Sequence, residues 1–144
     1  MRLSGPLLAR LALIRDALLP ELRNRFLGLE EGEPPGPVAT FRAPHPGIGR
    51  VTVTDDGDEA TVSAGRTHGH FDGWERGLTI AERESRIVED VVEFLSALFA
   101  DEIVVWEAER QDGWYWIEGD GKPIELPPGA VGYTWSGPYE PPSG

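Results

Sequence analysis

The sequence predicts an α+β fold, in which an antiparallel sheet of five or six strands carries an N-terminal helix and a second long helix, at about residues 79–100, packed on one face. Apolar residues recur at three- and four-residue steps near the N-terminus and again after residue 79, which is the spacing of one helical face. Elsewhere, short alternating stretches flank Asp-Gly pairs, which favour β-hairpins. A chain of 144 residues suits a single α+β domain, 1–144.

The N-terminal helical segment is predicted to cover residues 1–29. Its apolar face consists of Leu7, Leu11, Ile14, Leu18, Leu22, Phe26 and Leu29. Pro20 lies opposite this face, so either a kinked helix or two consecutive helices would fit. The stretch EEGEPPGP, at 30–37, is rich in proline and glycine and is predicted to be a linker.

The body of the domain, 38–126, begins with strands. VATFR, at 38–42, is a short predicted strand, and GRVTVT and EATVSA flank the turn at 55–58. Pairing Asp55 with Asp58 sets the register of this hairpin. The expected apolar pairs are Val53 with Ala60 and Val51 with Val62, and the polar face holds Thr52, Thr54, Thr61 and Ser63.

The segment THGHFD, which follows this hairpin, holds two of the three histidines, His68 and His70. If the preceding strand continued without a break, both histidines would face the core. A bulge at Gly65 or Gly69 would switch the faces and turn Phe71 inward. Because Phe71 is the obvious core residue, we expect the bulge, with both histidines facing solvent.

The second helix, at about 79–100, has clear boundaries. Thr79 followed by Glu82 is a capping box, in which each side chain binds a free N–H group of the first turn. The apolar stripe that should pack on the sheet holds Ile80, Ile87, Val88, Val91, Phe94, Leu95, Leu98 and Phe99. The opposite side holds Glu82, Arg86, Glu89 and Glu93 and is mainly acidic.

Residues 102–126 are predicted to form a three-stranded meander with turns at Asp112-Gly113 and at Asp120-Gly121. Counting outward from the turns places Trp114 and Trp116 on an outer face with Glu107 and Glu109. The remaining segment, 127–144, is an arm rich in proline and glycine, either laid across the body through its aromatic residues or left as a mobile tail.

Charge is distributed unevenly along the chain. Residues 1–50 carry seven arginines against five acidic residues, whereas residues 51–144 carry six basic against twenty acidic residues, and the formal net charge is −12. Such acidity repels nucleic acid and anionic membranes and attracts basic proteins or cations. We therefore expect a basic protein partner, no nucleic acid and no membrane.

The chain contains no cysteine, which excludes disulfides and thiolate metal sites and favours the cytoplasm. Arg10, Arg15 and Asp16 interrupt the apolar N-terminal run, so neither a signal peptide nor a membrane span is expected. No serine lies in a nucleophile elbow, and no glycine-rich stretch opens a helix. The sequence thus predicts no catalytic residue and no cofactor.

A metal site is the alternative prediction. Two histidines separated by one residue in a strand lie on the same side and can supply two ligands to zinc or iron. His68, His70 and Asp72 resemble the opening of the metallo-β-lactamase motif, although that family has a further histidine where this chain has glycine; His68, His70 and Glu75 resemble part of the cupin motif. The alternative is a small metal-dependent enzyme using His45, His68 and His70.

The leading prediction is a non-enzymatic acidic binding protein. In size, acidity, absence of cysteine and absence of a catalytic set, the chain is similar to bacterial immunity proteins, which block cognate toxins. Tryptophans surrounded by carboxylates suit the docking of a basic surface. The expected partner-binding residues are Trp114, Trp116, Glu107 and Glu109, or else Glu82, Glu89 and Glu93 on the helix.

Overall fold

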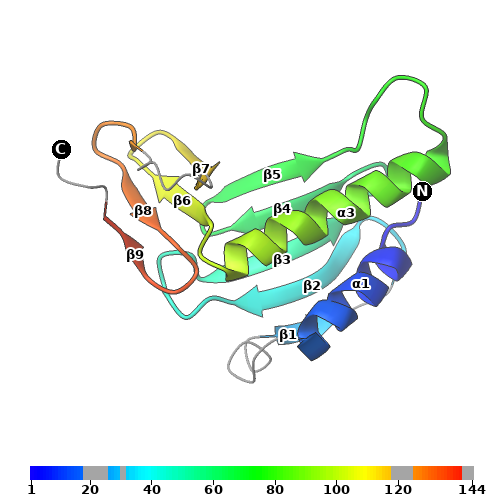
Figure 1. Cartoon of the computed structure of the whole chain (residues 1–144), viewed down its shortest axis with the longest axis horizontal. Coiled ribbons are helices and arrows are strands. Elements are labelled where there is room, and N and C mark those ends of the chain that lie inside the picture. The colour runs from blue at the N-terminus through cyan, green and yellow to red at the C-terminus, as the bar shows by residue number, and fades with distance from the viewer. Residues whose placement is uncertain (18–25, 30–31, 118–124, 141–144) are drawn as a thin grey trace.

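A computed structural model describes residues 1–17, 26–29, 32–117 and 125–140. Within these residues, two helices accompany nine strands, which divide into a five-stranded sheet of order β1-β2-β3-β4-β5 and a four-stranded sheet of order β7-β6-β8-β9 (Figure 1). All neighbouring strands are antiparallel. The α+β class is confirmed, whereas a single sheet of five or six strands is not, because the strands separate into two sheets.

The five-stranded sheet is the larger of the two sheets. Its strands are β1 (Phe26–Leu29), β2 (Gly36–Arg42), β3 (Arg50–Asp55), β4 (Ala60–Ala64) and β5 (Thr67–Phe71). Residues 26–29 were expected to be helical, and this expectation is wrong: they pair with β2, with Phe26 opposite Phe41. Strand β2 also begins inside the predicted linker, at Gly36.

The β3–β4 hairpin keeps its predicted faces but not its predicted register. Asp55 pairs with Ala60 rather than with Asp58, and Val53 pairs with Val62, so the loop spans four residues, 56–59. The pairing is displaced by two residues, and a displacement by an even number leaves every side chain on its original face. The valines are consequently buried as predicted.

A tight turn, and not the expected bulge, determines which side chains of the histidine-bearing strand face solvent. A two-residue turn, Gly65-Arg66, joins β4 to β5, and Ala64 pairs directly with Thr67. Gly65 has φ +61°, which the first central residue of a type II′ turn requires. The predicted outward direction of the histidines is confirmed, but a tight turn rather than a bulge produces it.

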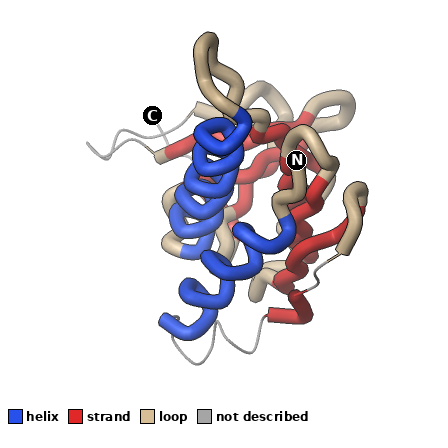
Figure 2. The backbone as a smooth tube through the Cα atoms, turned by 90° about the vertical axis from the view of Figure 1, so that its right-hand side faces the viewer, coloured by secondary structure: helices blue, strands red, loops and turns tan. Residues whose placement is uncertain are grey.

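Both helices lie on the same face of the five-stranded sheet, as Figure 2 shows. Helix α1 (Ser4–Ala17) packs against β2 and against the second helix, with Leu7 and Leu11 buried. Residues 18–25, which include Pro20, lie outside the described residues. No helix in the described parts of the chain is long and apolar enough to cross a membrane.

Helix α3 (Ile80–Phe99) begins and ends close to where the sequence places it. Thr79 caps it: the Glu82 backbone N–H donates to the Thr79 hydroxyl, and the Glu82 carboxylate accepts from the Thr79 N–H. The predicted apolar stripe is buried except for Ile80. Nine of its side chains are therefore buried in the core.

The four-stranded sheet differs more from the prediction. Its strands are β6 (Ile103–Glu107), β7 (Asp112–Trp116), β8 (Val131–Tyr133) and β9 (Pro138–Tyr139). Asp112 and Gly113 lie within β7, and the loop is at 108–111, where the Ala108 N–H donates to the Gln111 carbonyl. The predicted turn at Asp120-Gly121 lies outside the described residues, and the second neighbour of β6 is β8, from the C-terminal arm.

Aromatic contacts fasten this second sheet to the helix. Phe94 of α3 lies 4.4 Å from Trp114 and 5.6 Å from Phe71, measured between ring centroids. At the last residue of the helix, Phe99 lies 4.8 Å from Trp135, which is only 1% exposed. The described part of the C-terminal arm is thus laid across the body through a buried tryptophan.

Candidate functional site

The two histidines of β5 lie on the outer face of the sheet. His68 and His70 are both exposed, and their ring centroids are 5.2 Å apart in an edge-to-face arrangement. Thr67, the first residue of β5, is buried on the inner face of the sheet, so the side chains of His68 and Thr67 point to opposite faces. The pair is therefore accessible from solvent.

His70 belongs to a polar network with residues of the β3–β4 hairpin. Its Nδ1 lies 3.0 Å from Glu59 Oε1 and 3.1 Å from Thr61 Oγ1. The Thr61 hydroxyl in turn donates to Asp56 Oδ2 at 2.5 Å. Among the described residues, Asp56, Glu59 and His70 form a group of possible metal ligands, with their ligand atoms all within 4.8 Å of one another.

The third histidine lies in a different environment. The His45 ring lies against Tyr133 of β8, with centroids 5.1 Å apart and the rings tilted by 32°, and its Nδ1 accepts a hydrogen bond from the Gly47 N–H. The structure therefore does not bring His45, His68 and His70 together as one ligand set. The sequence-based expectation named His70 but missed Asp56 and Glu59, which become its neighbours only through the pairing of β4 with β5.

The tryptophans of β7 share a face with Glu107, as the sequence predicts, but this face turns toward the helix. Trp114 is half-buried against Phe94, and its indole lies over Gly69, where an added Cβ would be 2.3 Å from Trp114 Cζ2. Trp116 is 44% exposed at the edge of the same cluster. Trp114 therefore joins the two sheets, and Trp116 offers the accessible part of this face.

The acidic residues expected to surround a partner are placed as follows. Glu107 is half-buried and lies 3.8 Å from Arg66, whereas Glu109 is exposed in the 108–111 loop. On α3, Glu82, Glu89 and Glu93 are all exposed, but Glu82 is engaged in the helix cap and Glu89 forms an ion pair with Arg10.

A more prominent exposed aromatic residue lies in the segment between β5 and α3. Trp74 is 70% exposed, and Ile80, at the start of α3, is 72% exposed. This segment projects beyond the end of the helix in Figures 1 and 2. Trp74 was not among the expected site residues, although the sequence DGWERG holds a signal: a large aromatic residue between two turn-forming glycines, in a segment too polar to form core.

Several contacts hold this segment in place. The Trp74 N–H donates to Asp72 Oδ1 at 3.0 Å, and Arg83 donates from Nε to the Asp72 carbonyl at 2.6 Å. Arg86 forms an ion pair with Glu75. Arg83 also donates to the Asp58 carbonyl at 2.9 Å, which ties the segment to the β3–β4 loop.

We name the surface formed by residues 56–59 and 72–82 the acidic end.

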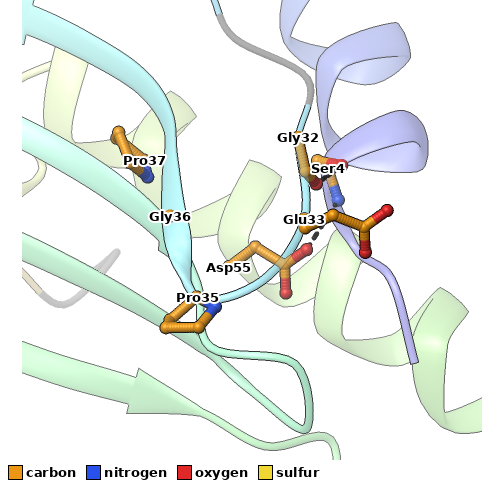
Figure 3. Close-up of a pocket in the computed structure, with 7 residues that line it drawn as sticks. All are labelled: Ser4, Gly32, Glu33, Pro35, Gly36, Pro37 and Asp55. Atoms are coloured by element: carbon orange, nitrogen blue, oxygen red, sulfur yellow. Dashed lines mark hydrogen bonds between the residues drawn. The ribbon is translucent and has the colours of Figure 1, made fainter.

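A cavity of about 260 Å³ lies between α1, the segment before β2 and the β3–β4 hairpin (Figure 3). Asp55, which is 1% exposed, points into this joint; its Oδ2 accepts from the N–H groups of Leu3 and Ser4, at 2.9 and 3.1 Å, and its Oδ1 accepts from the Gly57 N–H at 2.9 Å. A carboxylate at a helix N-terminus also interacts favourably with the helix dipole. Asp55 is therefore a structural anchor for α1.

Comparison of the chain with protein-family models, with curated proteins and with solved structures finds no match.

Proposed function

We propose that the chain is a non-enzymatic acidic binding protein and that a basic protein docks on its acidic end. The observation that carries this proposal is Trp74, a tryptophan 70% exposed on a segment that the rest of the molecule holds in place. Interfaces concentrate their binding energy in a few anchors, among which tryptophan is prominent. Ile80, from the same segment, supplies further apolar surface.

The fixed conformation of the segment favours binding. Ordering a loop during association costs free energy that is subtracted from the affinity. Here Arg83 bonds to two carbonyl groups, those of Asp58 and Asp72, and Gly73 is buried against the first turn of α3 with φ +57°. An added Cβ at Gly73 would lie 2.8 Å from the Arg83 carbonyl oxygen, so the close approach depends on glycine. Trp74 is presented before a partner arrives.

The charge around Trp74 selects the kind of partner. Carboxylates outnumber arginines on the acidic end, and two of the neighbouring arginines, Arg83 and Arg86, are already engaged within the chain. Together with the net charge of −12, this surface attracts a basic protein and repels nucleic acid. The same field increases the association rate and makes it dependent on salt.

The face that the sequence favours remains a second prediction for the same function. Trp116 is its most accessible aromatic residue, with Glu109 exposed nearby in sequence and Trp114 largely committed to the core. The exposed helix residues Glu89 and Glu93 would extend a docking surface along α3. Comparison of variants at Trp74 and Trp116 decides between the two surfaces.

In its narrower form, the proposal is that the partner is a bacterial toxin, that the chain neutralises it in the manner of an immunity protein, and that the two meet in the cytoplasm. The small, acidic, cysteine-free chain is suited to this role. Expressing the partner alone and together with the chain tests it. Growth arrest by the partner, relieved by the wild-type chain, supports the narrower form; a partner without toxicity contradicts it.

Photo-crosslinking tests the docking surface itself. The photoreactive residue p-benzoylphenylalanine replaces Trp74 in one variant and, as a matched control, Val131 in another; Val131 is 52% exposed on β8, at the opposite end of the molecule in Figure 1. We expect irradiation to yield an adduct with one basic protein from position 74 and none from position 131. The captured protein, once purified, should bind the chain more weakly as salt rises.

Two outcomes contradict the docking proposal. One is an adduct from position 131 but none from position 74. The other is a captured protein that carries no excess of lysine and arginine, or one whose purified form fails to bind the chain.

A further inference from the structure

We propose that Asp56, Glu59 and His70 form a binding site for a divalent metal ion that accepts both imidazole and carboxylate ligands, such as Zn²⁺. Their ligand atoms lie within 4.8 Å of one another. Two ligand atoms bound to one zinc ion at ~2.1 Å each are at most about 4.2 Å apart, so only a small contraction would bring all three into contact with an ion. Asp56 and Glu59 also lie on the acidic end, but metal binding at this site does not depend on whether a protein docks there.

The backbone fixes the three ligands relative to one another. Asp56 and Glu59 are the first and last residues of the β3–β4 loop, and the Asp56 N–H donates to the Glu59 carbonyl at 2.9 Å. His70 lies on β5 directly opposite Thr61 of β4. Ligands on paired strands and on a closed loop lose little conformational freedom when they bind an ion.

Thr61 orients one of the three ligands, Asp56, and lies beside a second, His70. Its hydroxyl donates to Asp56 Oδ2 at 2.5 Å and lies 3.1 Å from His70 Nδ1. Metal sites commonly hold their ligands in this way, through hydrogen bonds from neighbouring side chains. The contact of 3.0 Å between His70 Nδ1 and Glu59 Oε1 also places a nitrogen and an oxygen donor side by side, where a cation can replace a shared proton.

The donor types and their exposure indicate which ion is suitable. One imidazole with two carboxylates suits Zn²⁺ and related ions, whereas Ca²⁺ takes six to eight oxygen ligands and Mg²⁺ keeps most of its water. The Glu59 side chain is 29% exposed and the His70 side chain 54% exposed, so water has access to complete the coordination. The ion would join the β3–β4 loop to β5.

The core does not include these three side chains, so the fold does not depend on the ion. Zinc binding is therefore measured on the intact chain, free of metal and of any histidine tag, by calorimetric titration with ZnCl₂. We expect saturation at one ion per chain. His70→Gln removes one ligand at an exposed position and should raise the dissociation constant for Zn²⁺ at least about tenfold. Glu59→Gln should have a similar effect.

The matched control is His45→Gln, which removes a histidine that lies against Tyr133 and should leave the dissociation constant unchanged. Circular dichroism checks that each variant is folded, and NMR locates the ion through shifts of the His70 ring signals in the wild-type chain. Absence of one-to-one saturation, equal weakening by the His45 and His70 variants, or displacement of Zn²⁺ by equimolar Ca²⁺ would overturn the proposal.

Discussion

Replacing the buried carboxylate of Asp55 should destabilise the protein, because this carboxylate holds the N-terminal end of helix α1. In Asp55→Ala, three N–H groups lose their acceptor: those of Leu3, Ser4 and Gly57. A hydrogen bond to a charged group contributes about 1.5–3 kcal/mol, and the three bonds share one acceptor and will not add fully, so we expect a loss of about 3–5 kcal/mol in the free energy of unfolding. A domain of this size has roughly 5–15 kcal/mol in total.

Urea denaturation followed by circular dichroism measures this loss. The matched control is Asp58→Ala, an exposed residue of the adjacent loop, whose bond to Arg83 uses the backbone carbonyl and survives the substitution. It should change stability by less than about 0.5 kcal/mol. Asp55→Asn keeps one acceptor oxygen and should fall between the two. A loss below about 1 kcal/mol in Asp55→Ala would refute the assignment of Asp55 as an anchor for α1.

Three further predictions test the packing between the two sheets and the cap of helix α3. Gly69→Ala places a methyl group against the Trp114 indole and should lower the free energy of unfolding by about 1–3 kcal/mol through overpacking. In the control, Gly137→Ala, the added methyl group meets open space. Equal stability of the two variants in urea would contradict the close approach of Trp114 to Gly69. Trp114→Ala should cost about 3 kcal/mol and Trp116→Ala clearly less, because only the former is packed over Gly69; the reverse order on thermal unfolding would be inconsistent with the aromatic cluster. Thr79→Ala removes the helix cap and should lower the free energy of unfolding by about 1 kcal/mol. Amide hydrogen exchange should become faster mainly in the first turn of α3. An equal increase along the whole helix would argue against a local cap.

Local sequence patterns predicted the helix of residues 80–99 and both faces of the β3–β4 hairpin. The capping box at Thr79 fixes the start of the helix without help from the rest of the fold. The faces of the hairpin survived an error in register because the error was an even number of residues. Short-range chemistry was sufficient for these elements.

The second hairpin shows why an Asp-Gly pair can mislead. Gly113 lies in β7 rather than in a turn, and its lack of a side chain serves packing: an added Cβ would lie 2.9 Å from Cζ2 of Trp106. Close approach and a tight turn both require glycine, and only the assembled sheet distinguishes them. Residues 26–29 are a similar case. Their apolar spacing predicts a helix, but in the assembled fold they pair with β2 as a strand, which local spacing does not reveal.

The candidate sites were predicted only in part, because they depend on contacts between segments distant in sequence. His70 was recognised, but its neighbours Asp56 and Glu59 follow from the pairing of β4 with β5. Local sequence patterns do not predict Trp74 as a site residue, because its fixed orientation depends on Arg83, which lies in the first turn of α3 and donates to the Asp72 carbonyl. Neither relation leaves a periodic signal in the sequence.

The most direct test of the docking proposal is the affinity of the purified captured partner for Trp74→Ala and for Trp116→Ala, measured by calorimetric titration beside the wild-type chain. Trp74 is exposed and outside the core, so its replacement should leave the fold intact while weakening binding by about 30-fold or more, equivalent to about 2 kcal/mol. Trp116→Ala should bind nearly as the wild type does. Unchanged affinity in the folded Trp74 variant would contradict docking on the acidic end, and a large loss in the Trp116 variant alone would move the partner to the face of β7.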